Sequence, residues 1–103
     1  MLQPDRYRGR RVVVLGLARS GVAVAEWFHR IGADVVVNDK KERPQCPEAD
    51  ALSALGITVI CGGHPDDLVE GDVALVVKNP GIPYTIPPIV RAFQRGIPVV
   101  TEV

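Results

Sequence analysis

The sequence predicts an α/β fold, a doubly wound parallel sheet of five strands with helices on both faces. Three observations predict it. Continuous apolar runs rich in Val and Ile recur along the 103 residues, as is typical of strands buried on both faces. Segments with helical spacing of apolar residues lie between these runs, and glycines separate helix from strand at Gly32, Gly56 and Gly96. With right-handed crossovers we expect the strand order 3-2-1-4-5, the Rossmann-like arrangement.

The first strand is predicted over residues 12–15, where an unbroken apolar run, mostly β-branched, follows a basic stretch. Gly16 comes directly after this strand, and a helical pattern begins within the next five residues. Residues 1–10 are expected to form a polar lead-in to a single domain at residues 11–103. The apolar stripe of the first helix is predicted to comprise Val24, Trp27, Phe28 and Ile31.

The second strand is predicted over residues 35–37, and it leads into a polar turn. Pro47 is placed to open the second helix at its first turn. The third strand is predicted over residues 57–61, and the glycine turn after it makes His64 an expected exposed loop residue. The inward face of the second helix is predicted to comprise Ala51, Leu52 and Leu55.

The fourth strand is predicted over residues 73–77, and the fifth over residues 98–101. Between them lies a loop rich in Pro and Gly, followed by a helical pattern. Thr85 is placed to cap this third helix, because its hydroxyl can accept from a free backbone N–H, and the two prolines that follow are tolerated in a first turn. The buried stripe of the third helix is predicted to comprise Ile86, Ile89, Val90 and Phe93.

Composition narrows the function classes. Apolar residues make up 47% of the chain but aromatic ones only 5%, which predicts an aliphatic core. Twelve basic residues balance twelve acidic ones, which argues against nucleic acid as a partner. We expect no membrane span and no signal peptide. Cys46 and Cys61 lack the spacing of a zinc site, so free thiols in a cytoplasmic protein are expected. We also expect a monomer.

Three loops are predicted to meet at the carboxyl ends of the strands, because the first and fourth strands are neighbours at the switch point of this sheet order. They are residues 16–21, the pair Asp39 and Lys40, and residues 78–83. Backbone N–H groups at the start of the first helix favour an anion such as phosphate. An acidic residue at the end of the second strand is where such folds contact a ribose or base. The alternatives are a glycine turn without ligand and a solvated Asp39.

The glycine loop departs from the dinucleotide fingerprint G-x-G-x-x-G. It reads Gly-Leu-Ala-Arg-Ser-Gly over residues 16–21, so Ala18 stands where the middle glycine allows closest approach to a pyrophosphate. The added methyl group leaves room for a phosphate but disfavours a nicotinamide dinucleotide. Because the loop still resembles the fingerprint at its two outer glycines, the main alternative function is an NAD(P)-binding domain of a dehydrogenase or regulator. An interaction module without a ligand is the next alternative.

Four blocks of the sequence resemble the N-terminal domain of the Mur ligases. The blocks are VLGLARSG at residues 14–21, VND at 37–39, VKNPGIP at 77–83 and GIPVVTE at 96–102. They come in the family's order and spacing, and the resemblance covers the chain from about residue 11 to 103. The glycine loop is most similar to that of the branch that adds D-glutamate.

The resemblance implies a cytoplasmic ligase of peptidoglycan synthesis, in three domains, that joins D-glutamate to UDP-N-acetylmuramoyl-L-alanine. ATP and Mg²⁺ would bind the second domain, where the substrate carboxylate becomes an acyl phosphate that the amine of D-glutamate attacks. The first domain would bind the UDP end of the substrate. The implied contacts are Gly16, Arg19, Ser20 and Gly21 with the diphosphate, Asp39 and Lys40 with the uracil, and Asn79, Pro80 and Gly81 over the nucleotide.

The resemblance also bears on what these residues would not do. The family's Gly-Lys-Thr/Ser loop for ATP does not occur in the sequence, and neither do the family's magnesium ligands. We therefore expect these residues to bind the nucleotide-sugar and not to catalyse, with ATP and Mg²⁺ bound elsewhere in a full-length enzyme.

Overall fold

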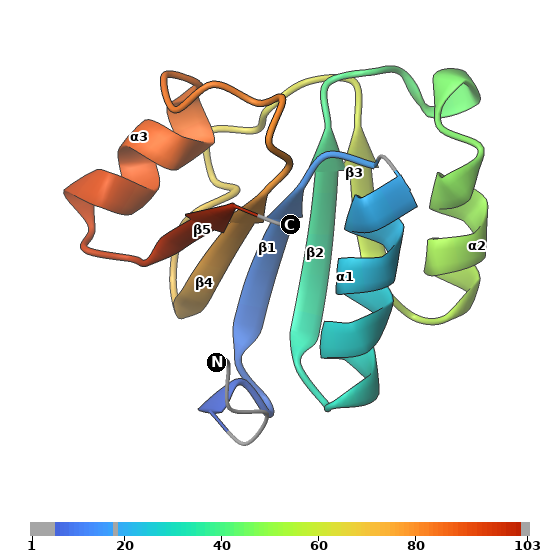
Figure 1. The fold of residues 1–103 in the computed structure, drawn as a ribbon, viewed down its shortest axis with the longest axis horizontal. Coiled ribbons are helices and arrows are strands. Elements are labelled where there is room, and N and C mark those ends of the chain that lie inside the picture. The colour runs from blue at the N-terminus through green and yellow to red at the C-terminus, as the bar shows by residue number, and fades with distance from the viewer. Residues whose placement is uncertain (1–5, 18, 102–103) are drawn as a thin grey trace.

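The structure is a computed structural model that describes residues 6–17 and 19–101. Five parallel strands form one sheet in the order β3-β2-β1-β4-β5, which confirms the predicted arrangement (Figure 1). The strands are β1 (Arg11–Leu15), β2 (Asp34–Asp39), β3 (Thr58–Cys61), β4 (Val73–Lys78) and β5 (Val99–Thr101). The helices are α1 (Arg19–Arg30), α2 (Glu48–Ala54) and α3 (Pro87–Gln94), with a short 3₁₀ turn η2 (Arg43–Gln45) before α2.

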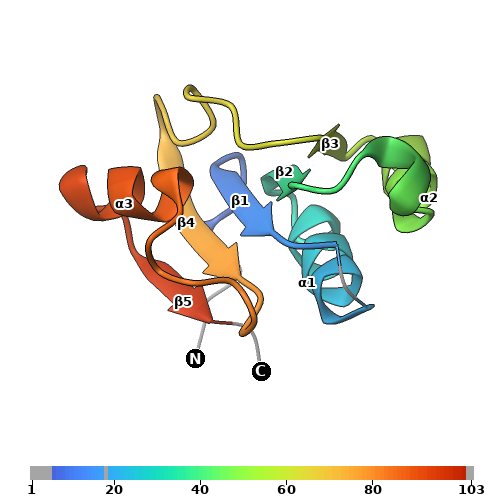
Figure 2. The same ribbon diagram turned by 90° about the horizontal axis from the view of Figure 1, so that it is seen from above.

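Helices cover both faces of the sheet, as predicted. Figure 2 shows α1 and α2 on one side and α3 on the other. Because side chains alternate along a strand, β1 serves both cores: Val12 and Val14 pack toward α1 and α2, whereas Val13 and Leu15 pack toward α3. All four side chains are fully buried. The aliphatic core predicted from composition is therefore divided between two layers, with β1 at the centre.

Each helix buries a narrower stripe than its periodicity predicts. A large apolar residue and an alanine three positions apart face the sheet, and the methyl group of alanine lets the helix approach closely. The pairs are Ala25 with Phe28, Ala49 with Leu52, and Ile89 with Ala92. The broader predicted stripes are wrong at their edges, where Trp27, Ala51, Leu55, Val90 and Phe93 are exposed.

Two aromatic residues pack against Phe28 in the core between the sheet and helices α1 and α2. Tyr7 lies in the stretch predicted as a lead-in, yet its side chain is buried and its ring meets that of Phe28 edge-on at 5.5 Å. Trp27 covers the same Phe28 ring from outside, with centroids 5.0 Å apart. The N–H of Gly9 donates to the carbonyl of Gly32, which ties the segment before β1 to the end of α1.

The three glycines that separate helix from strand all have a left-handed backbone, as their positions predicted: φ is 94° at Gly32, 92° at Gly56 and 70° at Gly96. The next residue then donates its N–H back into the helix and buries its side chain, as Ile57 does to Leu52 and Ile97 to Ala92. At the start of α3 the N-cap residue is Ile86, which makes no side-chain hydrogen bond to the helix. The prediction that Thr85 caps this helix is therefore wrong. Prolines occupy the first helical positions. No helix in the described residues is long and apolar enough to cross a membrane.

Candidate functional site

A pocket of about 320 Å³ lies at the carboxyl ends of β1, β2 and β4, where the three loops were predicted to meet. Of the predicted site residues, Gly16, Asp39, Lys40, Asn79 and Gly81 line it. Gly21 lies within α1 and Pro80 is exposed, and neither lines the pocket. Ala18 and the side chains of Arg19 and Ser20 fall outside what the structure describes. The remaining lining residues are Leu17, Asn38, Lys41, His64, Ile82, Pro83 and Ile86.

The carboxylate of Asp39 joins the glycine loop to the turn after β2. One oxygen accepts from the backbone N–H of Leu17 at 2.8 Å, and the other accepts from the backbone N–H of Lys41 at 2.9 Å. Hydrogen bonds to a charged acceptor are stronger than those between neutral groups. Asp39 is therefore a positioning residue for two sides of the pocket, whether or not a ligand is bound, and the prediction of a merely solvated turn residue is excluded.

Gly16 packs against Asn79 in the loop after β4. Its φ of 104° suits glycine, and a Cβ atom built on it would lie 3.0 Å from the Cβ of Asn79. Backbone hydrogen bonds hold both neighbours: the N–H of Gly16 donates to Asn38, and the N–H of Asn79 donates to Leu15. The glycine is thus required by the packing of two loops as well as by the tight turn.

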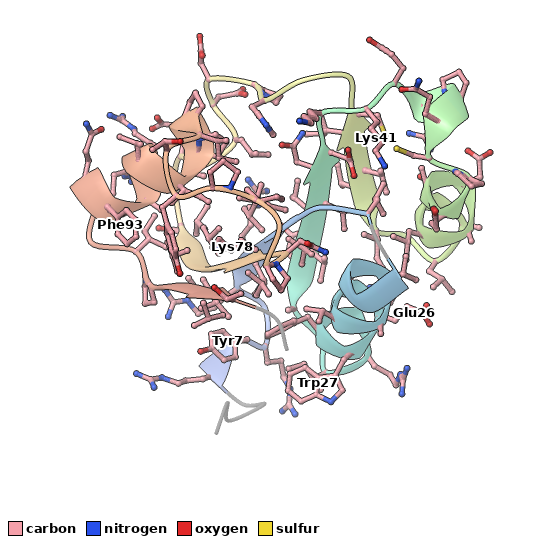
Figure 3. The ribbon with its side chains drawn as sticks, turned by 45° about the horizontal axis from the view of Figure 1, so that its top comes forward. Tyr7, Glu26, Trp27, Lys41, Lys78 and Phe93 are labelled. Carbon is pink, nitrogen blue, oxygen red and sulfur yellow. The ribbon has the colours of Figure 1, made fainter. Side chains whose placement is uncertain are left out.

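Lys78 stabilises the loop that follows β4 through hydrogen bonds to its backbone. Its side chain is only 3% exposed, and its ammonium group donates to the carbonyl of Ile82 at 2.9 Å and to that of Asn79 at 3.3 Å. Lys78 is labelled in Figure 3. Its ammonium group also lies 4.5 Å from the centre of the Tyr84 ring, a cation–π contact. The side-chain oxygen of Asn79 accepts from the N–H of Gly81 at 2.9 Å, which completes a compact turn. Lys78 ends β4 instead of opening the loop as predicted, and its buried ammonium group has no signal in the local sequence pattern.

Asn38 and His64 were also missed as site residues. Asn38 is fully buried although it is polar, and its side chain donates to two carbonyl oxygens, that of Ile60 in β3 and that of Gly63 in the turn after β3. His64 was expected to be exposed, but it is partly buried, lines the pocket and lies 2.5 Å from the Asn38 side chain. The available signal was the asparagine itself, because a polar residue at the end of an apolar strand needs buried partners.

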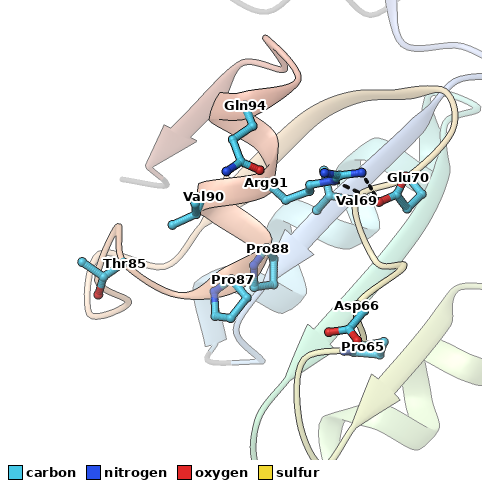
Figure 4. Close-up of a pocket in the computed structure, with 10 residues that line it drawn as sticks. All are labelled: Pro65, Asp66, Val69, Glu70, Thr85, Pro87, Pro88, Val90, Arg91 and Gln94. Carbon is cyan, nitrogen blue, oxygen red and sulfur yellow. Dashed lines mark hydrogen bonds and ion pairs between the residues drawn. The ribbon is translucent and has the colours of Figure 1, made fainter.

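A second cavity, of about 600 Å³, lies elsewhere, between α3 and the segment that follows β3 (Figure 4). Glu70 accepts ion pairs there from Arg91 at 2.9 Å and from Arg95 at 3.4 Å. No residue of the three predicted loops lines this cavity. The lining residues are Pro65, Asp66, Val69, Glu70, Thr85, Pro87, Pro88, Val90, Arg91 and Gln94. The pocket of about 320 Å³ that the glycine loop, Asp39 and the loop of Asn79 line is therefore the better candidate site, and is called the three-loop pocket below.

Both cysteines are free thiols, as expected. Burial, reinforced by the negative charge of Asp39, raises the pKa of the Cys46 thiol to about 11. A thiol with so high a pKa is a poor nucleophile at neutral pH. Among the described residues there is no group of three or more His, Cys, Asp and Glu side chains that could hold a metal ion.

The family described as "Mur ligase MurD-like, N-terminal domain" matches residues 10–101. The chain belongs to the MurD-like Mur ligases. The UDP-N-acetylmuramoylalanine–D-glutamate ligase of Geobacillus sp. is 53% identical over 103 residues, which is 100% of this chain and 23% of that protein. The enzyme of the same name from Lactiplantibacillus plantarum is 52% identical and is covered to 22%. This MurD-like chain thus spans less than a quarter of the length of these relatives.

Solved structures agree with the fold of this MurD-like domain. UDP-N-acetylmuramate–alanine ligase from Thermotoga maritima superposes with a TM-score of 0.75 and 26% identity, over 90% of this chain and 21% of that one. The C-terminal domain of a hydrogenase from Pyrococcus furiosus superposes with a TM-score of 0.70 over 95% of this chain and 94% of its own. L-tryptophan dehydrogenase from Nostoc punctiforme gives 0.60, over 92% of this chain and 34% of that one. At 16% and 18% identity, the last two show the fold alone.

Proposed function

We propose that this domain binds the UDP end of UDP-N-acetylmuramoyl-L-alanine, within a cytoplasmic ligase that adds D-glutamate to that substrate in peptidoglycan synthesis. The observation that carries the proposal is the pocket in which the glycine loop, Asp39 and the loop of Asn79 meet. Relatives at 50–53% identity are named as D-glutamate ligases of UDP-N-acetylmuramoylalanine, and their names support the substrate. The switch point of a doubly wound sheet is also where this fold class binds nucleotides.

The uracil is assigned to the Asp39 side of the pocket. A carboxylate offers about four lone-pair positions, so Asp39 can accept from the imide N–H of uracil while it holds Leu17 and Lys41. Those two bonds fix the carboxylate in place before the ligand arrives, which lowers the entropy cost of binding. Lys40 lines the same side of the pocket and would contact the base or its ribose.

The diphosphate is assigned to the start of α1. The helix begins at Arg19, so the backbone N–H groups of Arg19, Ser20 and Gly21 belong to its first turn, where the helix dipole favours an anion. The loop of Asn79, Pro80 and Gly81 would close over the nucleotide, and the buried ammonium of Lys78 supports that loop. Each of the three predicted loops thus has one part of the nucleotide to contact.

ATP and Mg²⁺ do not fit the residues described here. The sequence contains no Gly-Lys-Thr/Ser loop, and the described residues bring together no acidic cluster for a metal. We propose that both are bound by parts of the longer relatives that this chain does not cover. On its own, the domain is expected to bind the nucleotide-sugar without turning over ATP.

An NAD(P)-binding domain remains the second candidate, because dehydrogenases share the fold. Calorimetric titration of the chain with UDP and with NAD distinguishes the two. We expect UDP to bind more tightly, with amide chemical-shift changes at Gly16, Asp39 and Gly81. Asp39→Ala should weaken UDP binding by about 1–3 kcal/mol, the cost of leaving the imide N–H of uracil without an acceptor. NAD binding as tight as that of UDP, or shift changes away from these residues, would refute the proposal.

A further inference from the structure

The partners of Asn38 dictate which way its amide points. Its Nδ2 group donates to the carbonyl of Ile60 at 3.0 Å and to that of Gly63 at 2.7 Å, so both amide hydrogens are used. Rotating the amide by half a turn would set its oxygen against two carbonyl oxygens inside the protein, where such repulsion is costly. The Oδ1 atom of Asn38 must therefore face the imidazole of His64.

That orientation decides the tautomer of His64. An amide oxygen only accepts, so the Nδ1 atom of His64, 2.5 Å away, must carry a hydrogen. In a neutral imidazole the other nitrogen, Nε2, is then an acceptor with no hydrogen of its own. His64 lines the three-loop pocket while its Nδ1 is engaged with Asn38, which leaves Nε2 for a ligand.

We infer that the Nε2 atom of His64 accepts a hydrogen bond from a ribose hydroxyl of the bound uridine nucleotide. The inference rests on the proposed function. The oxygens of the diphosphate and the uracil carbonyls are all acceptors and cannot pair with a second acceptor. The donors of the nucleotide are the uracil imide, which is assigned to Asp39, and the ribose hydroxyls.

The position of His64 also suits a ribose. Its partner Asn38 accepts from the N–H of Gly16 in the glycine loop at 2.8 Å and directly precedes Asp39 in β2. His64 follows β3, the strand next to β2, so it enters the pocket beside Asp39, to which the base is assigned, and the ribose is the group attached to that base. The charged side chains that share the pocket are Asp39, Lys40 and Lys41.

The test compares UDP with 2′-deoxy-UDP and 3′-deoxy-UDP by calorimetry at pH 8. The native chain should bind UDP about 3- to 10-fold more tightly than one of the deoxy analogues, the effect of one hydrogen bond. His64→Phe keeps a ring of similar size without the acceptor, so it should lose that preference and bind UDP as weakly as the analogue. The other histidine, His29 in the last turn of α1, provides the matched control, and His29→Phe should behave as the native chain.

Nitrogen NMR of the native imidazole provides a readout that does not depend on how well His64→Phe folds. Nδ1 should be protonated and Nε2 unprotonated without ligand, and only the Nε2 signal should shift strongly when UDP is added. If the native chain binds no UDP, the proposed function itself fails and this contact with it. If UDP binds but His64→Phe keeps the preference for ribose, only the role of His64 is refuted. A loss that is equal for all three ligands would instead indicate a contact of His64 with the diphosphate and overturn the ribose contact.

Discussion

Replacing Asp39 by alanine should destabilise the protein even without ligand. The change removes two acceptors at once, one for the N–H of Leu17 at 2.8 Å and one for the N–H of Lys41 at 2.9 Å. The first bond is partly buried, so its loss should cost about 1.5–3 kcal/mol, as is usual for a charged acceptor. The second is exposed and should add about 0.5–1 kcal/mol. We expect a total of about 2–4 kcal/mol.

Urea unfolding measures this loss, which should lower the midpoint by about 1–2 M. Asp34→Ala is the matched control, because Asp34 begins the same strand β2 and makes an exposed ion pair with Arg11 at 3.1 Å. Such exposed pairs contribute at most about 1 kcal/mol. Asp39→Asn retains one acceptor oxygen and should fall between native and Asp39→Ala.

Two results would contradict this reasoning. One is a midpoint for Asp39→Ala no lower than that of Asp34→Ala, which would show that the carboxylate bonds contribute nothing. The other is an unchanged amide spectrum at Leu17 and Lys41, because the loss of their acceptor must alter both signals.

Two further predictions concern burial and backbone strain. Gly16→Ala should lower the free energy of unfolding, measured by thermal unfolding, by about 1–3 kcal/mol, because φ is 104° and the new methyl group would lie 3.0 Å from Asn79. Gly81→Ala is the control: its methyl group would lie 3.4 Å from Asn79, so its thermal unfolding should change little. Cys46 should resist iodoacetamide at pH 8 while the partly exposed Cys61 reacts, since a pKa of about 11 in place of 9.0 lowers the thiolate fraction of Cys46 about a hundredfold. The rate at Cys46 should rise as the pH approaches 11; equal rates at pH 8 would refute the burial argument.

Local pattern was enough to predict much of this domain. Strands buried on both faces appear in the sequence as unbroken apolar runs, and each left-handed helix end requires a glycine, so the elements and their order follow from short segments. Once the order 3-2-1-4-5 is expected, the switch point brings the loops of Gly16, Asp39 and Asn79 together. The family likewise follows from four short blocks, and the match over residues 10–101 confirms it.

Tertiary structure decided which side chains face inward and which polar groups pair. Periodicity counts Trp27 and Phe93 as core residues, but close packing against the sheet selects the alanine side of each helix, and Phe93 is left 56% exposed. The partners of Asn38 lie 22 to 26 residues away, in β3 and the turn after it, so no local pattern could identify them. A buried polar group takes whatever partner the fold brings near it, because leaving it unpaired is costly. Short-range sequence signals therefore specify the backbone of the site, whereas the hydrogen bonds that orient its side chains depend on contacts that only the assembled sheet creates.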